Sequence, residues 1–289
     1  MATADAGNTW RLVGRLSPSL GGDTPAITKV RFATPLDGWV FGPQLWSTHD
    51  GGRTWRQISE PQPVSDVEAA GGVAYAVVGG QLLRTPVAAD SWQAVRQVGQ
   101  SATMALHGRA IWIVEGGGGP GATKLLASPD GASWRTLADP CAKLGPEWTL
   151  ISVAPVTSSH LYLLCGGGAA AGSEAKKLLF STDAGQTATA TAVDPPLSGD
   201  TNGVAAASDA VVAIPAVSGA SEVYRSGDAG KSWQTPLQQG DGGVGYFDVG
   251  FTTATQGVAI YGQLGRAGTS APQLLMTRDA GATWSVVHF

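Results

Sequence analysis

Short apolar runs recur along the whole chain, and each is bounded by Gly, Pro, Asp or Ser. No long segment places apolar residues at positions i, i+3, i+4 and i+7, as an amphipathic helix requires. Runs of about four to eight apolar residues with turn residues on both sides are typical of strands. The pattern therefore predicts an all-β protein.

One octapeptide, Ser/Thr-x-Asp-x-Gly-x-Thr/Ser-Trp, recurs along the chain. Full copies begin at Thr3, Thr48, Ser226 and Thr277. Weaker copies begin at Ser128, Ser181 and Thr85. The copy at Ser128 is one residue short, and the copy at Ser181 has Ala188 in place of the tryptophan. The repeated aspartates lie 45, 80, 53, 45 and 51 residues apart, and Asp90 divides the longest interval. This period is typical of one four-stranded propeller blade.

The residues of the octapeptide have the chemistry of a β-hairpin turn. Its aspartate can accept backbone N–H groups, its glycine can adopt a positive φ, and its hydroxyl can tie the turn to the departing strand. Six of the ten tryptophans occupy its last position. We expect so regular a placement to serve packing, as repeated residues in repeat proteins usually do.

Between octapeptides each repeat reads as three strands, and the octapeptide tryptophan begins a fourth. The result is a single β-propeller domain with six four-stranded blades, at about residues 16–60, 61–98, 99–138, 139–195, 196–238 and 239–289. Residues 8–15 remain as an extra N-terminal strand. This strand either closes the ring beside the last blade or is the remnant of a seventh blade. We favour six blades, with seven as the alternative.

The octapeptides resemble the BNR or Asp-box repeats of a propeller superfamily. That superfamily includes bacterial sialidases, xyloglucan-cleaving glycoside hydrolases, sortilin-type receptors and photosystem II assembly factors. The resemblance covers nearly the whole chain. It implies that the repeated aspartates lie in turns between third and fourth strands, on the face opposite the ligand site, and are structural. These residues are Asp5, Asp50, Asp130, Asp183, Asp228 and Asp279.

Catalytic signatures of the superfamily are weak in this chain. The segment Val30-Arg31-Phe32-Ala33 lacks the Ile-Pro of the sialidase signature, and Arg31 is the one inner-strand arginine expected to face the channel. A glycoside hydrolase would need two carboxyl groups roughly 5 to 9.5 Å apart. Candidates are Asp66, Glu115, Glu147, Asp200 and Asp248. Solvated loop charges would look the same in sequence, and no spacing selects a pair.

Chain length is distributed unevenly among the loops. Extra residues lie between second and third strands, at Glu115–Thr123, Gly166–Lys176, Val217–Ser221 and Gly262–Pro272, and before blades four to six. In a propeller these loops emerge opposite the octapeptides, so we predict the binding site on that long-loop face. Its candidate anchors are Trp148, Tyr246, Phe247, Tyr261, Arg266, Lys143 and Glu147. The alternative is that Trp148 and Phe247 pack inside their blades.

Cys141 and Cys165 are the two cysteines of the chain. Both fall at the same end of one predicted blade, so a disulfide is geometrically plausible, with two buried thiols as the alternative. A disulfide would imply an oxidising compartment.

The composition and charge of the chain limit the classes of partner that we expect. The 289 residues carry a formal net charge of -4, and 14% are charged. We therefore expect no nucleic-acid partner. No apolar stretch is long enough for a transmembrane helix, so we expect no membrane insertion. Gly116–Gly121 is followed by a strand and not by the helix of a nucleotide site. The octapeptides also lack the ligands of a calcium loop, so we expect no cofactor and no metal.

These observations favour a non-catalytic, extracytoplasmic propeller, secreted or anchored to the cell envelope, with its export signal outside this sequence. We expect a monomer that binds a protein or glycan through its long-loop face. The first alternative is a glycoside hydrolase with paired carboxylates at the channel. The second is an assembly factor for a membrane complex, which would require a basic patch that the few clustered Lys and Arg residues hardly provide.

Overall fold

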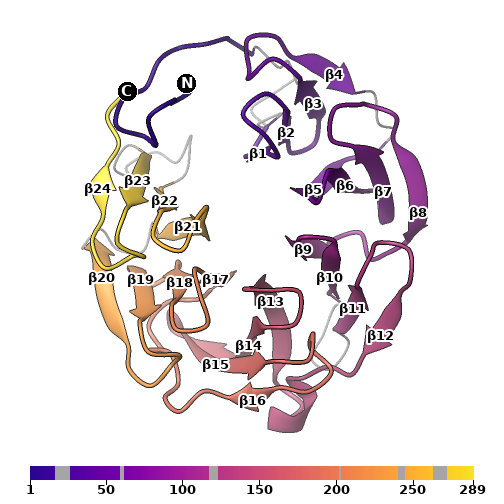
Figure 1. The fold of residues 1–289 in the computed structure, drawn as a ribbon. Coiled ribbons are helices and arrows are strands. Elements are labelled where there is room, and N and C mark those ends of the chain that lie inside the picture. Colours follow the sequence, from indigo (N-terminus) through magenta and orange to yellow (C-terminus); the bar gives the residue numbers. More distant parts are fainter. Residues whose placement is uncertain (17–26, 59–61, 117–122, 202, 240–244, 263–271) are drawn as a thin grey trace. The chain divides into compact units, whose positions relative to one another are not determined.

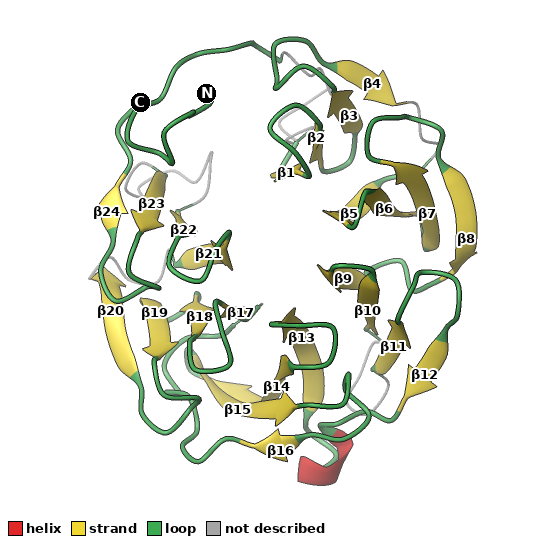
Figure 2. Cartoon of the chain, in the orientation of Figure 1, coloured by secondary structure: helices red, strands yellow, loops and turns green. Residues whose placement is uncertain are grey.

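The computed structural model describes residues 1–16, 27–58, 62–116, 123–201, 203–239, 245–262 and 272–289. These residues form 24 strands in six sheets of four, and consecutive strands are neighbours in each sheet (Figures 1 and 2). This confirms the all-β class and the six four-stranded blades of a β-propeller. The chain divides into two compact units, residues 1–116 with 125–136 and Phe289, and residues 117–124 with 137–288.

The first unit contains blades one to three, except for the terminal residues Lys124 and Leu137 of blade three. Blade one comprises β1 (Lys29–Phe32), β2 (Gly38–Phe41), β3 (Leu45–Thr48) and β4 (Arg56–Ile58). Blade two comprises β5 (Val64–Ala70), β6 (Val73–Val78), β7 (Gln81–Pro86) and β8 (Gln93–Gln97). Blade three comprises β9 (Thr103–His107), β10 (Ala110–Glu115), β11 (Lys124–Ser128) and β12 (Arg135–Leu137).

The second unit contains blades four to six, after a short 3₁₀ helix, Ala142–Leu144. Blade four comprises β13 (Thr149–Pro155), β14 (Leu161–Ala170), β15 (Ser173–Ser181) and β16 (Thr189–Ala190). Blade five comprises β17 (Ala205–Ala206), β18 (Val212–Ala216), β19 (Ser221–Ser226) and β20 (Gln234–Gln239). Blade six comprises β21 (Tyr246–Phe251), β22 (Gly257–Tyr261), β23 (Gln273–Thr277) and β24 (Ser285–Val286).

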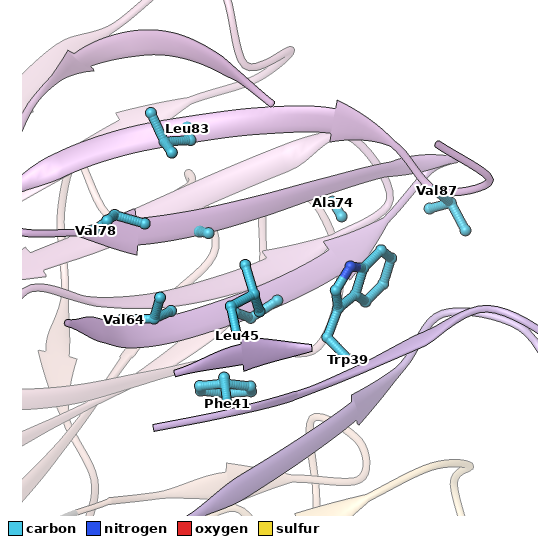
Figure 3. Close-up of a cluster of buried hydrophobic side chains, with 10 residues drawn as sticks. Trp39, Phe41, Leu45, Val64, Ala74, Val78, Leu83 and Val87 are labelled. Atoms are coloured by element: carbon cyan, nitrogen blue, oxygen red, sulfur yellow. The ribbon is translucent and has the colours of Figure 1, made fainter. Parts of the chain in front are cut away.

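The core lies between adjacent blades of a unit. Between blades one and two, Trp39, Phe41 and Leu45 pack against Val64 and Val67, all of them buried (Figure 3). Second strands have packed neighbours on both faces, which is why their sequences are continuously apolar, as in β10. Fourth strands such as β12 and β24 are largely exposed. Removing large apolar side chains from water in this way is the main stabilising contribution to such a fold.

The octapeptides form the turns between third and fourth strands. In blade six, Asp279 accepts the Thr283 backbone N–H at 2.8 Å and the Thr283 hydroxyl at 2.6 Å, while Gly281 N–H donates to the Thr277 hydroxyl at 2.8 Å. Such hydrogen bonds from the threonine or serine hydroxyl and amide favour the charged carboxylate. They lower the pKa to about 2 at Asp5, Asp50, Asp183, Asp228 and Asp279.

In five copies both central residues of the turn have positive φ, whereas the sequence predicted this for the glycine alone. In four copies the residue before the glycine is an alanine with φ of 56° to 62°, namely Ala6, Ala184, Ala229 and Ala280. A non-glycine residue adopts this conformation at a cost, so the carboxylate hydrogen bonds of the turn must offset it.

The hairpin of blade four corrects one prediction. Gly166–Lys176 was expected to be a loop, but β14 and β15 stay paired to Ala170 and Ser173, across a register shift between Gly166 and Ala169. The run Gly166–Gly172 consists of small residues, so it lacks the larger apolar side chains by which a strand is predicted from sequence. Strand pairing thus extends into the segment that was predicted to be a loop.

The predicted disulfide between Cys141 and Cys165 is confirmed, with Cα atoms 5.7 Å apart. Both residues belong to the second unit. Near the N-terminus, Ala2 and Arg11 form an isolated bridge, and the role of residues 8–15 in ring closure stays a prediction. No helix in the described part of the chain is long and apolar enough to cross a membrane.

Candidate functional site

The first strands of blades one and two carry two pairs of opposite charge. Strand β1 presents Lys29 and Arg31, and β5 presents Asp66 and Glu68. Alternate residues of a strand point to the same face, so each pair shares one face of its strand. Strands β1 and β5 contact each other. We refer to these four side chains as the charged cluster.

Contacts within the charged cluster link three blades. The Arg31 guanidinium forms an ion pair with the Glu68 carboxylate. Asp66 is buried and accepts the Met104 backbone N–H of β9 at 2.7 Å. Arg31 has 44% of its side chain exposed, against 19% for Glu68. The carboxylates are therefore the more buried members, and the arginine keeps an exposed part beside its ion pair.

Burial has the largest effect on the pKa values of Asp66 and Glu68. It raises the pKa of Glu68 to about 7, although Arg31 opposes the rise and the charge of Asp66 adds to it. Burial likewise raises the pKa of Asp66 despite the nearby charges of Lys29 and Arg31 and the N–H of Met104. Strongly shifted carboxyl groups beside cations are typical of functional sites.

Strand β1 itself is exposed along its whole length. It is an edge strand of its sheet, and Val30 and Phe32 are 57% and 43% exposed. The Phe32 ring meets Trp55 edge-on, with ring centroids 6.2 Å apart. An exposed strand edge that bears two cations and an aliphatic side chain can hold an extended, acidic ligand.

The five candidate carboxylates predicted from the sequence differ in their unit and in their exposure to solvent. Asp66 belongs to the charged cluster, and Glu115 ends β10 in the same unit. In the second unit, Glu147 and Asp248 are exposed, while Asp200 is half-buried and pairs its backbone with Val217. The structure adds Glu68, two residues after Asp66, as the carboxyl group closest to a catalytic setting.

The candidate anchors also occupy different settings. Tyr246 and Tyr261 are 0% and 2% exposed and pack on each other in the core of blades five and six, so neither is a surface anchor. Trp148 is half-buried against Gly167, as the packing alternative expects. Phe247 is half-buried, and Lys143 is exposed. The exposed Glu147 is described above, and Arg266 lies outside the described residues.

Sequence reasoning missed Lys29 and Glu68. Their signal was the alternation of charges in Lys29-x-Arg31 and Asp66-x-Glu68, which places like charges on one strand face. Only the packing of β5 beside β1 makes the two alternations complementary. In the described part of the chain, no group of three or more His, Cys, Asp or Glu side chains could hold a metal ion.

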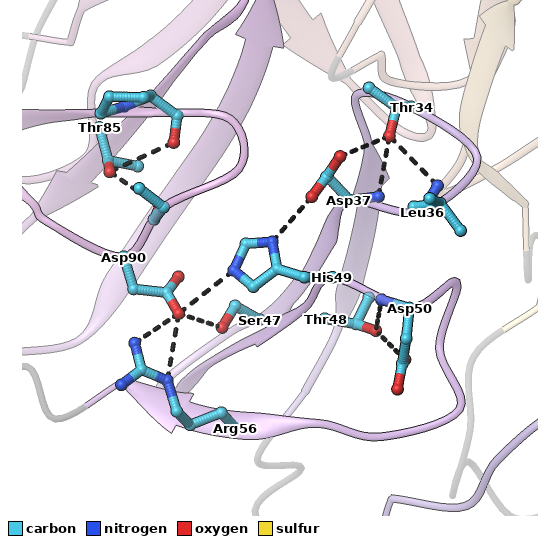
Figure 4. A network of polar contacts seen from close by, with 12 residues as sticks. Thr34, Leu36, Asp37, Ser47, Thr48, His49, Asp50, Arg56, Thr85 and Asp90 are labelled. Carbon is cyan, nitrogen blue, oxygen red and sulfur yellow. Dashed lines mark hydrogen bonds and ion pairs between the residues drawn. The ribbon is translucent and has the colours of Figure 1, made fainter.

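A second polar network joins blades one and two at their octapeptide turns (Figure 4). Asp90 accepts hydrogen bonds from the Ser47 hydroxyl at 2.9 Å and from Arg56 Nε at 3.1 Å, and it lies 3.3 Å from His49 Nε2. His49 Nδ1 lies 2.8 Å from Asp37. Asp90 of blade two thus contacts Ser47, His49 and Arg56 of blade one, and we interpret the network as a structural clamp between the two blades.

This clamp predicts a pH dependence of stability. Burial opposes the charged form of His49, but hydrogen bonds to Asp37 and Asp90 outweigh it and raise the pKa above the ordinary 6.5. Because the folded pKa is raised, the stabilisation is fully present below about pH 6.5 and is lost as the pH rises through the folded value. We expect His49→Gln to flatten that part of the melting-temperature profile.

The measurement is a series of thermal melts across pH on the wild type and on His49→Gln, with the exposed His288→Gln as control. The control should keep the wild-type profile. Equal slopes for wild type and His49→Gln above pH 6.5 would contradict the assignment.

Neither a protein-family model nor a curated protein sequence matches the chain. Solved structures do match. YCF48 from Cyanidioschyzon merolae is 16% identical with a TM-score of 0.60, over 90% of this chain and 84% of that one. YCF48 bound to D1 peptide is 18% identical with a TM-score of 0.60, over 93% and 86%. The chain shares the fold of these proteins.

A GH74 xyloglucanase from Xanthomonas campestris is 16% identical with a TM-score of 0.65, over 90% of this chain. The match covers 45% of that enzyme. At such identities the likeness shows the propeller fold alone.

Proposed function

We propose that this protein is a non-catalytic propeller that binds an extended segment of a protein partner on β1 and the charged cluster. The observation that carries the proposal is the exposure of β1, an edge strand with Lys29 and Arg31 on one face and Val30 on the other. A peptide complex of YCF48 supports this reading, because that protein shares the fold.

The physical basis is the unpaired edge of the strand. Free N–H and C=O groups of an edge strand can pair with an added peptide strand, and side chains along the edge select its sequence. Arg31 and Lys29 would favour carboxylates at alternate positions of that peptide, since charge-assisted hydrogen bonds are the stronger ones. The preferred partner segment is therefore extended and acidic.

The proposal places the protein outside the cytoplasm. Its support is the disulfide Cys141–Cys165, because disulfides persist in oxidising compartments.

The test is binding to synthetic peptides that share one β-prone core and differ only in carrying acidic, neutral or basic residues. We expect the acidic set to bind best and to weaken with salt. The double variant Lys29→Glu/Arg31→Glu should lose about tenfold or more in affinity, because it replaces two attractive charges with two repulsive ones. Calorimetry measures the affinity.

Arg135→Glu is the matched control, because Arg135 is an exposed arginine on the outer strand β12 of the same unit. It should bind like the wild type. Equal loss in both variants, or no preference for acidic peptides, would sink the proposal.

Glycoside hydrolysis is the second candidate, favoured by one observation. Glu68 has a pKa of about 7 beside a second carboxyl group, which suits a general acid. However, Asp66 is buried and already accepts the Met104 amide, so it is poorly placed to attack a substrate. Turnover of xyloglucan or chromogenic glycosides that Glu68→Gln abolishes would replace the binding proposal with this one.

A further inference from the structure

The Arg31 guanidinium has a partner inside the protein and an exposed part beside it. It forms an ion pair with Glu68, while 44% of the arginine side chain and 19% of the glutamate side chain stay exposed. A guanidinium carries five N–H donors in a planar fork, so it can bind two carboxylates at once. A ligand carboxylate that binds Arg31 therefore shares this guanidinium with Glu68.

Sharing one arginine brings like charges close together. The ligand carboxylate would join Glu68 and Asp66, which gives three negative charges beside the two cations Lys29 and Arg31. A nearby like charge disfavours the ionised form of a carboxyl group, and so does burial. The ligand carboxylate keeps its contact with water, whereas Glu68 is mostly buried. Glu68 is therefore the group that we expect to take up a proton when the ligand binds.

The pKa of Glu68 lies where this proton uptake is possible. Burial raises it to about 7, the charge of Asp66 adds to the rise, and Arg31 and Lys29 oppose it. Ordinary carboxyl groups of a peptide titrate near about pH 4. Near neutral pH, Glu68 is thus present in both forms, while the carboxylates of an acidic ligand are ionised.

The other strands around Glu68 contribute no further charge to it. Strand β5 contacts β1, β2, β6 and β9. Lys29 and Arg31 lie on β1, and β2 has no titratable side chain. Tyr75 of β6 pairs with Glu68 across the strands, but burial raises the pKa of its hydroxyl, which stays uncharged. His107 ends β9 and is exposed. The charges that act on Glu68 are those of the charged cluster itself.

We infer that binding of an acidic segment at the charged cluster is coupled to proton uptake by Glu68, so that the Arg31–Glu68 ion pair restrains binding at alkaline pH. This inference rests on the proposed function, because it needs a ligand with carboxylates on β1. Protonated Glu68 no longer competes for the guanidinium. A ligand that prefers the protonated form raises the Glu68 pKa further, so affinity rises as the pH falls through that pKa and levels off below it.

The experiment is calorimetry with the acidic β-prone peptide and its neutral counterpart, from about pH 6 to about pH 8.5 at constant ionic strength. Each titration is repeated in two buffers that differ in ionisation enthalpy, which gives the number of protons taken up. We expect the acidic peptide to take up as much as about one proton and to lose up to about tenfold in affinity per pH unit above the Glu68 pKa. The neutral peptide should show neither effect.

Glu68→Gln keeps the size of the side chain and removes its titration. At alkaline pH it should bind the acidic peptide more tightly than the wild type does, without proton uptake. His107→Gln is the matched control, because histidine also changes its charge near neutral pH and His107 belongs to the same unit. It should keep the wild-type coupling.

Three outcomes overturn the inference alone: acidic peptides that bind best but without proton uptake, a Glu68→Gln variant that keeps the pH dependence, or a His107→Gln variant that loses it. No preference for acidic peptides at any pH would overturn the proposed function and this inference with it. Proton uptake is measured on the wild type, so the test does not depend on the folding of a variant.

Discussion

Replacing Lys176 with methionine is expected to lower the free energy of unfolding by about 3 kcal/mol or more. Lys176 lies on β15 and is 1% exposed. Its ammonium nitrogen lies 2.6 to 3.3 Å from five backbone carbonyl oxygens, among which its three N–H groups are shared: those of Glu174, Pro196, Leu197, Ser198 and Gly199. Methionine fills similar space but removes the ammonium from these oxygens. The Leu197 and Ser198 oxygens keep a second donor, the Glu174 N–H and the Tyr224 hydroxyl. Each buried acceptor that is left unpaired is costly.

Two opposing effects act on the charge of the Lys176 ammonium. Burial lowers the pKa of Lys176, while Glu174, Asp200 and Glu222 favour the charged form. The ammonium fixes the connection Pro196–Gly199 onto blade four, and so fixes the entry into blade five. The variant should therefore also loosen that connection, which backbone hydrogen exchange would report.

Lys177→Met is the control for this prediction. Lys177 follows in the same strand, points the opposite way, and forms a surface ion pair with Asp194. Exposed pairs contribute about 1 kcal/mol or less, so this variant should stay close to the wild type. Urea unfolding followed by tryptophan fluorescence compares the two, and a similar small loss in both would refute the role given to Lys176.

Removing the disulfide is expected to cost about 3 kcal/mol of unfolding free energy. Cys141 and Cys165 are 24 residues apart, and the link joins the segment before β13 to the middle of β14. A cross-link over such a segment restricts the unfolded chain, which raises its free energy relative to the folded state. The variant is Cys141→Ala/Cys165→Ala, which removes both thiols.

Reduction provides an independent measurement of the same effect. Dithiothreitol should lower the melting temperature of the wild type toward that of the double variant and leave the double variant unchanged. A wild type that melts at the same temperature with and without the reductant, under conditions where both thiols become titratable, would contradict this expectation.

Repeated local chemistry explains why so much of the fold was predictable. A turn such as Thr277–Trp284 is specified by its own residues: aspartate, glycine and hydroxyl bond to one another within eight positions. Six such periods determine the number of blades. The predicted disulfide followed because Cys141 and Cys165 fall at one end of the same blade. Where small residues dilute the apolar signal, as in Gly166–Gly172, the prediction of a loop was wrong.

The candidate site was harder to predict because it joins residues that no local pattern connects. Asp66 was singled out as a carboxylate, but its partners are Met104 of another blade and, through Glu68, Arg31 of a third. Tyr246 and Tyr261 read as surface anchors in sequence, although the stacking of blades five and six buries both rings. Nothing in the sequence around Lys176 indicated that its side chain would be buried.

The sequence alone determined the strand class and the turns and favoured six blades over seven, because hairpin turns and alternation are short-range properties of the chain. Only the tertiary structure decided which charges meet and which aromatic rings are buried. Those outcomes depend on blade packing, which places residues tens of positions apart in contact and removes them from water together.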